Sequence, residues 1–423
     1  MSKEIKIMTL GFIVFFAGCI LPSGPEPLNV TASTDQTGMI ILNWDPTENA
    51  VSYNIYRSDD CSGEFELIAG SQVDVSYTDT SLKAGGQAYY KVSSINASGM
   101  EESMSDCVYG KALCAGLVWE GDYTISEPLD VDQISGYSEI TGNLTIAGDD
   151  IENLDGLECL NAVGGNLDIG VFRFGGMIDN PLLTDINGLE NLTSVGGYFN
   201  IATNTVLESL EGLNSLESIG KHLYILSNSS LEKINGFNSL TTVSEFLMIT
   251  RNPSLISIEG FNRLKFTGRD LIINENSALE HIDAFPEMTS VGTVGSMQGS
   301  PGTHGGLSIG LNPMLSTIRI LNNISSLEGG GLGIAINPSL TNISGTENLT
   351  SIAGDLAIIY NDRLAGLDGF SNLESVAGDL WIFCNAEVPE TQPEELKNRL
   401  LSEGWAGCWD FTCDDLFECD LTN

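Results

Sequence analysis

The chain has little histidine, the residue that enzymes use most often for acid–base chemistry. Its 423 residues include three histidines, at His222, His281 and His304, and no H-E-x-x-H, P-loop or EF-hand motif. The histidines fall in separate repeats of the pattern described below, so catalysis has no candidate residue. We therefore predict no enzyme activity and no cofactor. A carboxylate pair for glycoside cleavage among the 57 acids is the enzymatic alternative.

Positive charge is also scarce. Lys and Arg total 17 against 57 Asp and Glu, which gives a formal net charge of −40. Such a surface repels nucleic acid and anionic lipid headgroups, so we predict no nucleic-acid partner. It favours cationic partners, divalent ions or salty water, where screening acts within about 10 Å. A generally solubilising acidic surface is the plainest interpretation.

Long apolar runs are absent beyond the N-terminus, so no other segment is predicted to span a membrane. Lys3 and Lys6 precede an apolar run over residues 8–17, which is typical of a signal peptide and predicts one over residues 1–18. The run ends in F-A-G-C, which resembles the lipobox of bacterial lipoproteins, with Phe where Leu is usual. The resemblance implies a diacylglycerol on Cys19 and a cell-envelope protein, held to the membrane by lipid only and exposed to the surface or periplasm. An ordinary secretory signal, and a secreted protein, is the alternative.

Eight cysteines follow the predicted lipid attachment site. They are Cys61, Cys107, Cys114, Cys159, Cys384, Cys408, Cys413 and Cys419. An even number in an exported chain indicates disulfides. Their clustering predicts the bridges Cys61–Cys107 and Cys114–Cys159, with two more among the last four. We predict no metal site, because no C-x-x-C motif occurs and histidines are few.

The first folded block follows a short Pro-rich tether over residues 19–26. Its apolar alternation has the strand spacing of an all-β sandwich. Residues 27–112 resemble a fibronectin type III domain. The matching strings are P-L-N-V-T-A from Pro27, L-N-W-D from Leu42, Y-N-I-Y-R from Tyr53, L-K-A-G from Leu82 and Y-Y-K-V from Tyr89. The resemblance implies that Trp44 is the core tryptophan, that Tyr90 is the tyrosine corner, and that the domain is a spacer.

A different period begins near Cys114. The motif G-x-L-x-I, or a near variant, recurs around Leu144, Leu167, Phe199, Leu223, Leu247, Leu271, Leu307, Leu332, Leu356 and Leu380. This period, mostly in the twenties, predicts one coil of a β-solenoid per repeat. The recurrent Gly in the rest of each repeat favours strands and tight corners over helix. An Asn five residues after the strand Leu, from Asn204 to Asn385, predicts a stacked Asn ladder, which Asn180 begins in a displaced position.

Residues 114–385 resemble the receptor L domain, through these strand motifs and through strings such as D-I-N-G-L-E-N-L from Asp185. The resemblance implies a right-handed leucine-rich β-solenoid and ligand recognition on an extended sheet face. Residues 386–423 are predicted to be a Cys-rich C-terminal cap with one helix, from the N-cap Thr391 to Gly404 at C′. Its apolar face is predicted to consist of Leu396, Leu400 and Leu401. The fold class is all-β: a fibronectin type III sandwich, the solenoid, and the small helical cap.

The residues that flank the strand Leu are expected to point outward, since side chains alternate along a strand. On four adjacent coils they form an apolar and aromatic surface that is a candidate ligand-binding site. The candidates are Tyr198, His222, Tyr224, Phe246, Met248 and Ile272. Two further outward positions are expected at Asn200 and Asp270. The alternative is that the insertion at residues 170–177, or the loop at residues 291–305, covers this surface.

These patterns predict a lipid-anchored cell-surface binding or adhesion protein. Its partner would be an extracellular protein or polysaccharide held on the sheet face, with the sandwich as a stalk. Two alternatives remain open. One is a structural, acidic envelope or matrix component without a discrete ligand, and the other is a surface glycan-degrading enzyme.

Overall fold

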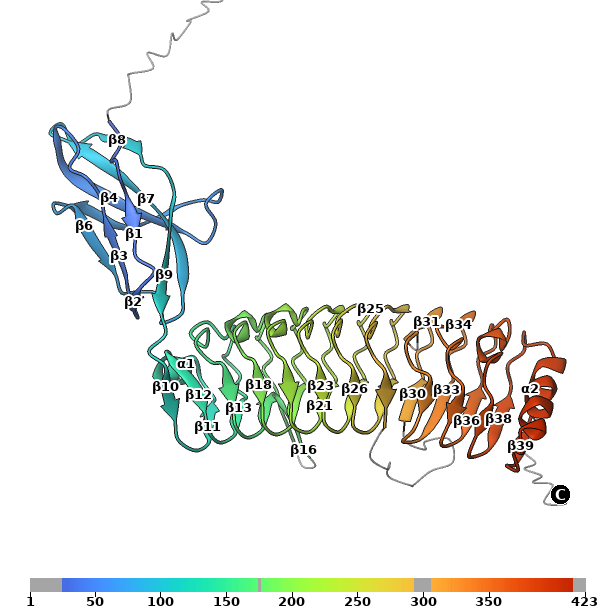
Figure 1. Cartoon of the computed structure of the whole chain (residues 1–423). Coiled ribbons are helices and arrows are strands. Elements are labelled where there is room, and N and C mark those ends of the chain that lie inside the picture. The colour runs from blue at the N-terminus through green and yellow to red at the C-terminus, as the bar shows by residue number, and fades with distance from the viewer. Residues whose placement is uncertain (1–24, 174–175, 293–305, 321, 414–423) are drawn as a thin grey trace, which may run out of the picture. The chain divides into compact units, whose positions relative to one another are not determined.

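The computed structural model describes residues 25–173, 176–292, 306–320 and 322–413 (Figure 1). The chain divides into two compact units, one formed mainly by residues up to 111 and the other mainly by residues from 112 onward. The predicted signal peptide, Cys19, His304 and Cys419 lie outside the described residues. In the part of the chain that is described, no helix is long and apolar enough to cross a membrane.

The first unit is built from short antiparallel strands. They are β1 (Thr31–Ala32), β2 (Gln36–Thr37), β3 (Ile40–Asn43), β4 (Ala50–Ser58), β5 (Glu66–Gln72), β6 (Ser76–Asp79), β7 (Gln87–Asn96), β8 (Glu101–Met104) and β9 (Val108–Leu113). One sheet has the order β1-β3-β6 and the other the order β2-β9-β7-β4-β5, with β8 beside β7. Alternate residues of β3 and β7 are buried, which is the period of two that a half-buried strand requires.

Trp44 and Tyr90 both lie in the core of this unit, as expected. The Tyr90 hydroxyl donates to Asp79 Oδ2 at 2.8 Å. A tyrosine corner would instead donate to a backbone carbonyl, so the assignment of Tyr90 to that role is wrong. Asp79 is 1% exposed and also contacts Arg57 Nη1 at 3.1 Å. A buried carboxylate needs hydrogen-bond donors, and Asp79 obtains one from the Tyr90 hydroxyl, which therefore does not donate to the backbone.

The second unit is a β-solenoid whose main sheet contains twelve parallel strands. They are β11 (Tyr123–Ile125), β13 (Leu144–Ile146), β15 (Leu167–Ile169), β19 (Phe199–Ala202), β21 (Leu223–Leu226), β24 (Leu247–Thr250), β27 (Leu271–Asn274), β30 (Gly306–Gly310), β33 (Gly331–Ala335), β36 (Leu356–Ile359), β38 (Leu380–Phe383) and β39 (Trp409–Asp410). Each strand pairs with its counterpart in the next coil without a register shift, for example Leu223 with Leu247 and Leu247 with Leu271. The repeat therefore predicted both the coils and their register.

Shorter parallel strands form the other sides of the coils. One eight-stranded sheet contains β10 (Leu117–Trp119), β12 (Tyr137–Ile140), β14 (Ala162–Val163), β18 (Ser194–Val195), β20 (Ser218–Ile219), β23 (Thr242–Val243), β26 (Phe266–Thr267) and β29 (Ser290–Val291). A five-stranded sheet contains β22 (Lys233–Ile234), β25 (Ser257–Ile258), β28 (His281–Ile282), β31 (Thr317–Arg319) and β34 (Asn342–Ser344). A three-stranded sheet contains β32 (Ser326–Leu327), β35 (Ser351–Ile352) and β37 (Ser375–Val376).

Not every coil is made only of strands. Three coils have a 3₁₀ turn in place of the expected extended segment, at η1 (Asn187–Leu189), η2 (Glu211–Leu213) and η3 (Asp368–Phe370). Helix α1 (Pro128–Ile134), which the repeat pattern did not predict, lies in the first coil. The insertion after Gly170 forms a hairpin of β16 (Val171–Arg173) and β17 (Gly176–Ile178). Spacing alone did not distinguish a 3₁₀ turn from a tight corner.

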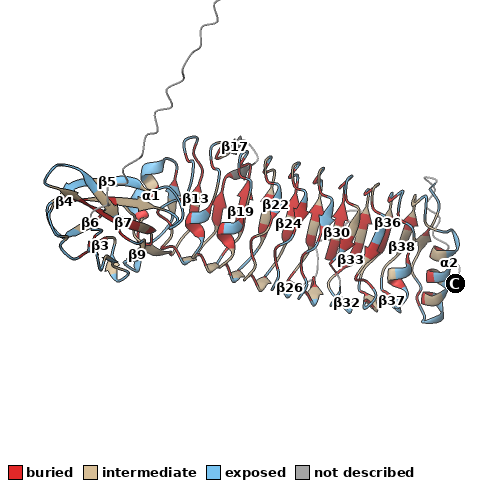
Figure 2. Ribbon diagram, turned by 90° about the horizontal axis from the view of Figure 1, so that it is seen from above, coloured by how far each residue is buried: buried red, intermediate tan, exposed pale blue. Residues whose placement is uncertain are grey.

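A continuous core fills the solenoid. Its buried residues run from Ile125 in the first coil to Leu400 in the cap, and Figure 2 shows the main-sheet strands as a band of buried residues. Phe237, Phe261 and Phe285 stack on one another with ring centroids 5.0 and 5.1 Å apart. Because each coil buries its apolar residues against its neighbours, no single coil is stable alone.

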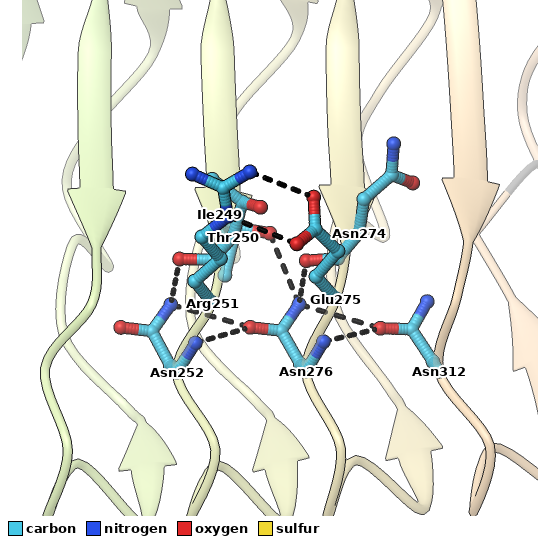
Figure 3. A network of polar contacts seen from close by, with 8 residues as sticks. All are labelled: Ile249, Thr250, Arg251, Asn252, Asn274, Glu275, Asn276 and Asn312. Atoms are coloured by element: carbon cyan, nitrogen blue, oxygen red, sulfur yellow. Dashed lines mark hydrogen bonds and ion pairs between the residues drawn. The ribbon is translucent and has the colours of Figure 1, made fainter.

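The predicted Asn ladder runs along the solenoid directly after the main sheet (Figure 3). Asn252 is typical: its Nδ2 donates to Ile225 O at 3.0 Å and to Asn276 Oδ1 at 3.3 Å. The backbone N–H of Asn252 donates to the same Asn276 oxygen at 3.1 Å. Asn180 joins the ladder by donating to Asn204 Oδ1 at 2.8 Å, as its displaced position predicted. Each amide thus satisfies the backbone at a corner and binds the next coil.

The cap follows the last coil. Helix α2 (Thr391–Ser402) lies at the C-terminal end of the solenoid (Figure 1), and Gly404 follows it at φ +92°. Two details of the prediction are wrong. Glu390 is the N-cap, so Thr391 is the first helical residue, and Leu401 is 38% exposed because it lies about 100° around the helix from the buried Leu400.

The disulfides follow the predicted clustering. Cys61–Cys107 and Cys114–Cys159 are both present. Cys384 pairs with Cys413, which ties the last coil to the cap, and Cys408 is also disulfide-bonded. Strand β39, in the cap, pairs with β38, so the main sheet continues past residue 385.

Candidate ligand-binding face

The six candidate residues meet on the side of the main sheet that points away from the core. Strand register places Tyr224, Met248 and Ile272 side by side on β21, β24 and β27. A second row, one residue before β19, β21 and β24, consists of Tyr198, His222 and Phe246. All six side chains are half-buried. We call these six residues the ring face.

His222 is the centre of the ring face. Its imidazole stacks on Tyr198 with ring centroids 5.9 Å apart and an interplanar angle of 9°. It also stacks on Tyr224 at 5.0 Å and meets Phe246 at 5.8 Å with a tilt of 48°. Aromatic pairs at these separations are attractive and hold one another in place. The rings therefore form one connected, ordered surface over three coils.

Polar groups surround these rings. Glu245 Oε2 lies 2.9 Å from His222 Nδ1, without the alignment of a good hydrogen bond. The Tyr198 hydroxyl donates to Asp168 Oδ2 at 3.1 Å. Asn200, expected to point outward to solvent, is instead 8% exposed, because it donates to Asp168 Oδ1 at 3.2 Å and to the carbonyl of Gly170 at 3.3 Å. The face therefore ends at Asn200, beside the start of the inserted hairpin.

Burial shifts the titration of several groups on this surface. It lowers the pKa of His222, and the nearby Glu245 carboxylate only partly offsets that effect. Burial, with a smaller effect of Glu245, raises the pKa of Tyr224. The pKa of Asp270 is also raised by burial, while the hydrogen bond from the Gly306 N–H acts against the shift. At neutral pH the rings of the face are therefore uncharged.

The row that contains Tyr198, His222 and Phe246 has a structural role elsewhere in the solenoid. In six other coils the residue at this pre-strand position is Asp or Asn, and its side chain accepts a hydrogen bond from the backbone N–H at the same position of the next coil. The accepting side chains, each followed by the residue whose backbone N–H donates, are Asp122 (Asn143), Asn143 (Asn166), Asn166 (Tyr198), Asp270 (Gly306), Asp355 (Asp379) and Asp379 (Cys408), with donor–acceptor distances of 2.7–3.1 Å. We call these positions the Asx row. At Gly331, in the same row, an added Cβ would lie 2.6 Å from Asp355 O, so steric crowding accounts for glycine there.

The rings occupy three successive positions of the Asx row. The phenyl group of Phe246 has no acceptor for the backbone N–H of the next coil. The coil of Phe246 therefore gives up a structural hydrogen bond in order to present a ring. Structural requirements of the solenoid alone do not explain this substitution.

The structure places two cations at the margin of the ring face that the alternation along the strands did not predict. Lys221, Glu245 and Arg269 form the row just before the rings, since Glu245 N donates to Lys221 O at 3.0 Å and Arg269 N to Glu245 O at 2.9 Å. The Arg269 guanidinium lies 5.5 Å from the centroid of the Phe246 ring. The concentration of cationic residues between positions 221 and 269 was the signal available for finding them.

Two residues of types that enzymes use in catalysis, Ser308 and His281, lie in strands of the solenoid. The string G-L-S-I-G over residues 306–310 has the form G-x-S-x-G, but all five residues lie in strand β30 and not on the strand–turn–helix elbow that exposes a nucleophilic serine. His281 is exposed on β28, with its Nε2 3.8 Å from Glu280 Oε2. Among the described residues no group of three or more His, Cys, Asp or Glu is arranged to hold a metal ion.

Comparisons with known proteins give partial matches. No protein-family model matches the chain. The chain is 33% identical over 84 residues to an amylopullulanase of Thermoanaerobacter thermohydrosulfuricus, which is 20% of this chain and 6% of that enzyme. It is 35% identical over 122 residues to an amylopullulanase of Thermoanaerobacterium saccharolyticum, which is 29% of this chain and 9% of that enzyme. The chain thus spans less than a tenth of the length of these curated relatives.

Solved structures include Fn3-like neighbours. An Fn3-like protein from Clostridium thermocellum is 28% identical and covers 21% of this chain and 94% of its own, with a TM-score of 0.20. The pectate lyase Pel3 from Pectobacterium carotovorum covers 87% of this chain and 88% of its own, at 11% identity and a TM-score of 0.18. Superpositions at these scores carry no argument about activity.

Proposed function

We propose that this chain is a non-catalytic binding protein that holds an extracellular polysaccharide on the ring face. The observation that supports the proposal is the replacement of the Asx row by Tyr198, His222 and Phe246 on adjacent coils. Phe246, whose phenyl group has no acceptor, forgoes a backbone hydrogen bond that contributes roughly 0.5–1.5 kcal/mol net. A ligand that packs on the rings offsets that cost when it binds.

The shape of the face suits an extended sugar chain. Adjacent parallel strands lie about 4.8 Å apart, so in-register rows place ring or apolar side chains at regular intervals along the solenoid. The C–H groups of a sugar pack on such rings, while its hydroxyls stay in water or meet polar groups at the edge. The Tyr198 hydroxyl supplies such a polar group at one end of the face.

The rest of the chain fits a surface protein in this proposal. Cys19 carries a lipid anchor, the fibronectin-like unit is a stalk, and the solenoid, a right-handed coil of the receptor L-domain type, is displayed at the cell surface. Mass spectrometry of the protein from a bacterial host tests the anchor. A diacylglycerol mass at the N-terminus of the processed chain, lost in Cys19→Ser, is expected.

Glycan binding is tested on the full chain carrying Cys19→Ser, so that lipid does not contribute. We expect saturable binding on an array of envelope and plant polysaccharides, and its loss in a Tyr224→Ser, Met248→Ser double variant. Tyr360→Ser, which removes an exposed ring from a different row, is the matched control and keeps binding. Circular dichroism confirms that each variant is folded. Binding to cell-surface proteins but to no glycan would refute the polysaccharide as ligand, and binding to neither would favour a structural envelope role.

A further inference from the structure

We infer that the polysaccharide is anionic, with carboxylate-bearing sugars. This inference rests on the proposed function, since it names the chemical class of ligand for the same face. It is drawn from the position of the few cations in a chain whose net charge is −40.

Cations concentrate in the coils that carry the ring face. The chain has 17 Lys and Arg, and six of them fall in the 49 residues from 221 to 269: Lys221, Lys233, Arg251, Arg263, Lys265 and Arg269. Two of the six, Lys221 and Arg269, stand in the row beside the rings. They are two coils apart, which is about 10 Å at the strand spacing of a sheet.

Each acid near the ring face has a contact within the fold. Asp168 accepts from Tyr198 and Asn200, Asp270 accepts from the Gly306 N–H at 2.7 Å, and Glu245 lies against His222. Lys221 is exposed and forms no ion pair with any described residue. Arg269 likewise lacks an ion-pair partner among the residues described, and its guanidinium packs on Phe246. The row of Lys221, Glu245 and Arg269 therefore has two cations and one acid, and its formal charge is positive by one.

A third cation, Arg251, lies at the opposite margin, where it pairs with Glu275. Its Nε lies 2.9 Å and its Nη2 3.3 Å from the carboxylate oxygens of Glu275 (Figure 3). The two margins thus differ. After the strands, Arg251 is neutralised by Glu275, whereas before the strands Lys221 and Arg269 are available to a ligand. A sugar that stacks on Phe246 or His222 would place a carboxylate within reach of Arg269 or Lys221.

The net charge does not prevent this. At physiological ionic strength charges interact over about 8 Å, so the acidic residues of distant coils are screened from a bound carboxylate. Contacts between a cation and a carboxylate within hydrogen-bond distance survive that screening, and a planar guanidinium adds bidentate geometry. An arginine held over an aromatic ring is also pre-positioned for such a contact.

The test compares polyuronates with neutral glycans. The full chain with Cys19→Ser is titrated with polygalacturonate and alginate, and with dextran and amylose as neutral chains. We expect polyuronate binding that weakens as NaCl is raised, and a loss of about tenfold or more in a Lys221→Gln, Arg269→Gln variant. The control, Lys233→Gln with Lys265→Gln, makes the same change of charge at exposed positions beside other sheets and should change affinity less than about twofold.

Each outcome separates the two proposals. If dextran or amylose binds as tightly as polyuronate and Tyr224→Ser abolishes binding, the ring face binds sugar but the anionic specificity is wrong. If the control double variant loses as much affinity as the Lys221 and Arg269 variant, the effect is one of general charge and the inference falls. If no glycan binds the wild type, both proposals are wrong.

Discussion

Phe246→Asn tests whether the rings displaced a structural hydrogen bond. An Asn at this position is expected to accept the backbone N–H of Asp270, as Asn166 accepts that of Tyr198 at 3.1 Å. The restored bond contributes roughly 0.5–1.5 kcal/mol. Loss of the half-buried ring, which contacts His222 and Arg269, costs about 1–3 kcal/mol in either variant at this site. Phe246→Asn should therefore be more stable than Phe246→Ala by roughly 0.5–1.5 kcal/mol.

The control is the same pair of substitutions at Met248, in the interior of β24. Met248 is not in the Asx row, so an Asn there has no hydrogen bond to restore. Asn is also disfavoured in strands, so Met248→Asn should be no more stable than Met248→Ala. Urea unfolding followed by circular dichroism measures all four variants, with a check that the m-value is unchanged. Both Phe246 variants should lose ligand binding. If Asn and Ala are equally stable at position 246, the rings did not replace a structural bond and the main support for the binding proposal is removed.

Three further predictions concern stability. Asn252→Ala removes the acceptor of the Asn228 N–H and the donor to Ile225 O, which leaves two buried backbone groups unpaired and lowers the unfolding free energy by roughly 2–6 kcal/mol. The control, Asn262→Ala at an exposed position, should change the unfolding free energy by less than about 0.5 kcal/mol. Equal urea midpoints for the two variants would contradict the role of the ladder. Cys384→Ser with Cys413→Ser removes a bridge that typically contributes about 2–4 kcal/mol and should make α2 the first site of limited proteolysis, and an unchanged cleavage pattern would count against the cap as a staple. Because burial lowers the pKa of His222, the unfolded chain takes up a proton at a higher pH than the folded chain, so His222 destabilises the fold as pH drops below about 6.5. The change in unfolding free energy between pH 7.5 and 5.5 should therefore be smaller in His222→Gln than in the wild type. An identical change in both proteins would show that His222 does not contribute.

The solenoid was predictable because each sequence repeat corresponds to one coil stacked on the next. Each G-x-L-x-I string supplies the two inward residues of one strand, and each following Asn supplies one corner, so spacing in sequence translates into register. The hairpin at β16 and β17 and helix α1 interrupt that pattern. Their form depends on local backbone preferences that the repeat does not encode, which is why the sequence showed only the insertion after Gly170 and no sign of α1.

The candidate site was predictable in part. Alternation along the strands placed Tyr224, Met248 and Ile272 on one face, and the structure has them side by side. Asn200 follows the same alternation but is buried, since its amide finds Asp168 and Gly170 across the neighbouring coil. The burial of Asn200 depends on hydrogen-bond acceptors in the neighbouring coil, so it cannot be predicted from the sequence of one repeat.

The Asn ladder has a consequence for how the surface can change over evolutionary time. It runs unbroken past the coils where the Asx row gives way to rings, as at Asn228, Asn252 and Asn276. Each strand is therefore fixed at the end that leads into the ladder, whatever residue precedes it. Where the backbone leaves room for a side chain, the residue before the strand can change at the cost of one hydrogen bond and without loss of the coil. A solenoid fastened along one edge in this way can acquire new specificities one coil at a time, by exchanging side chains along its other edge.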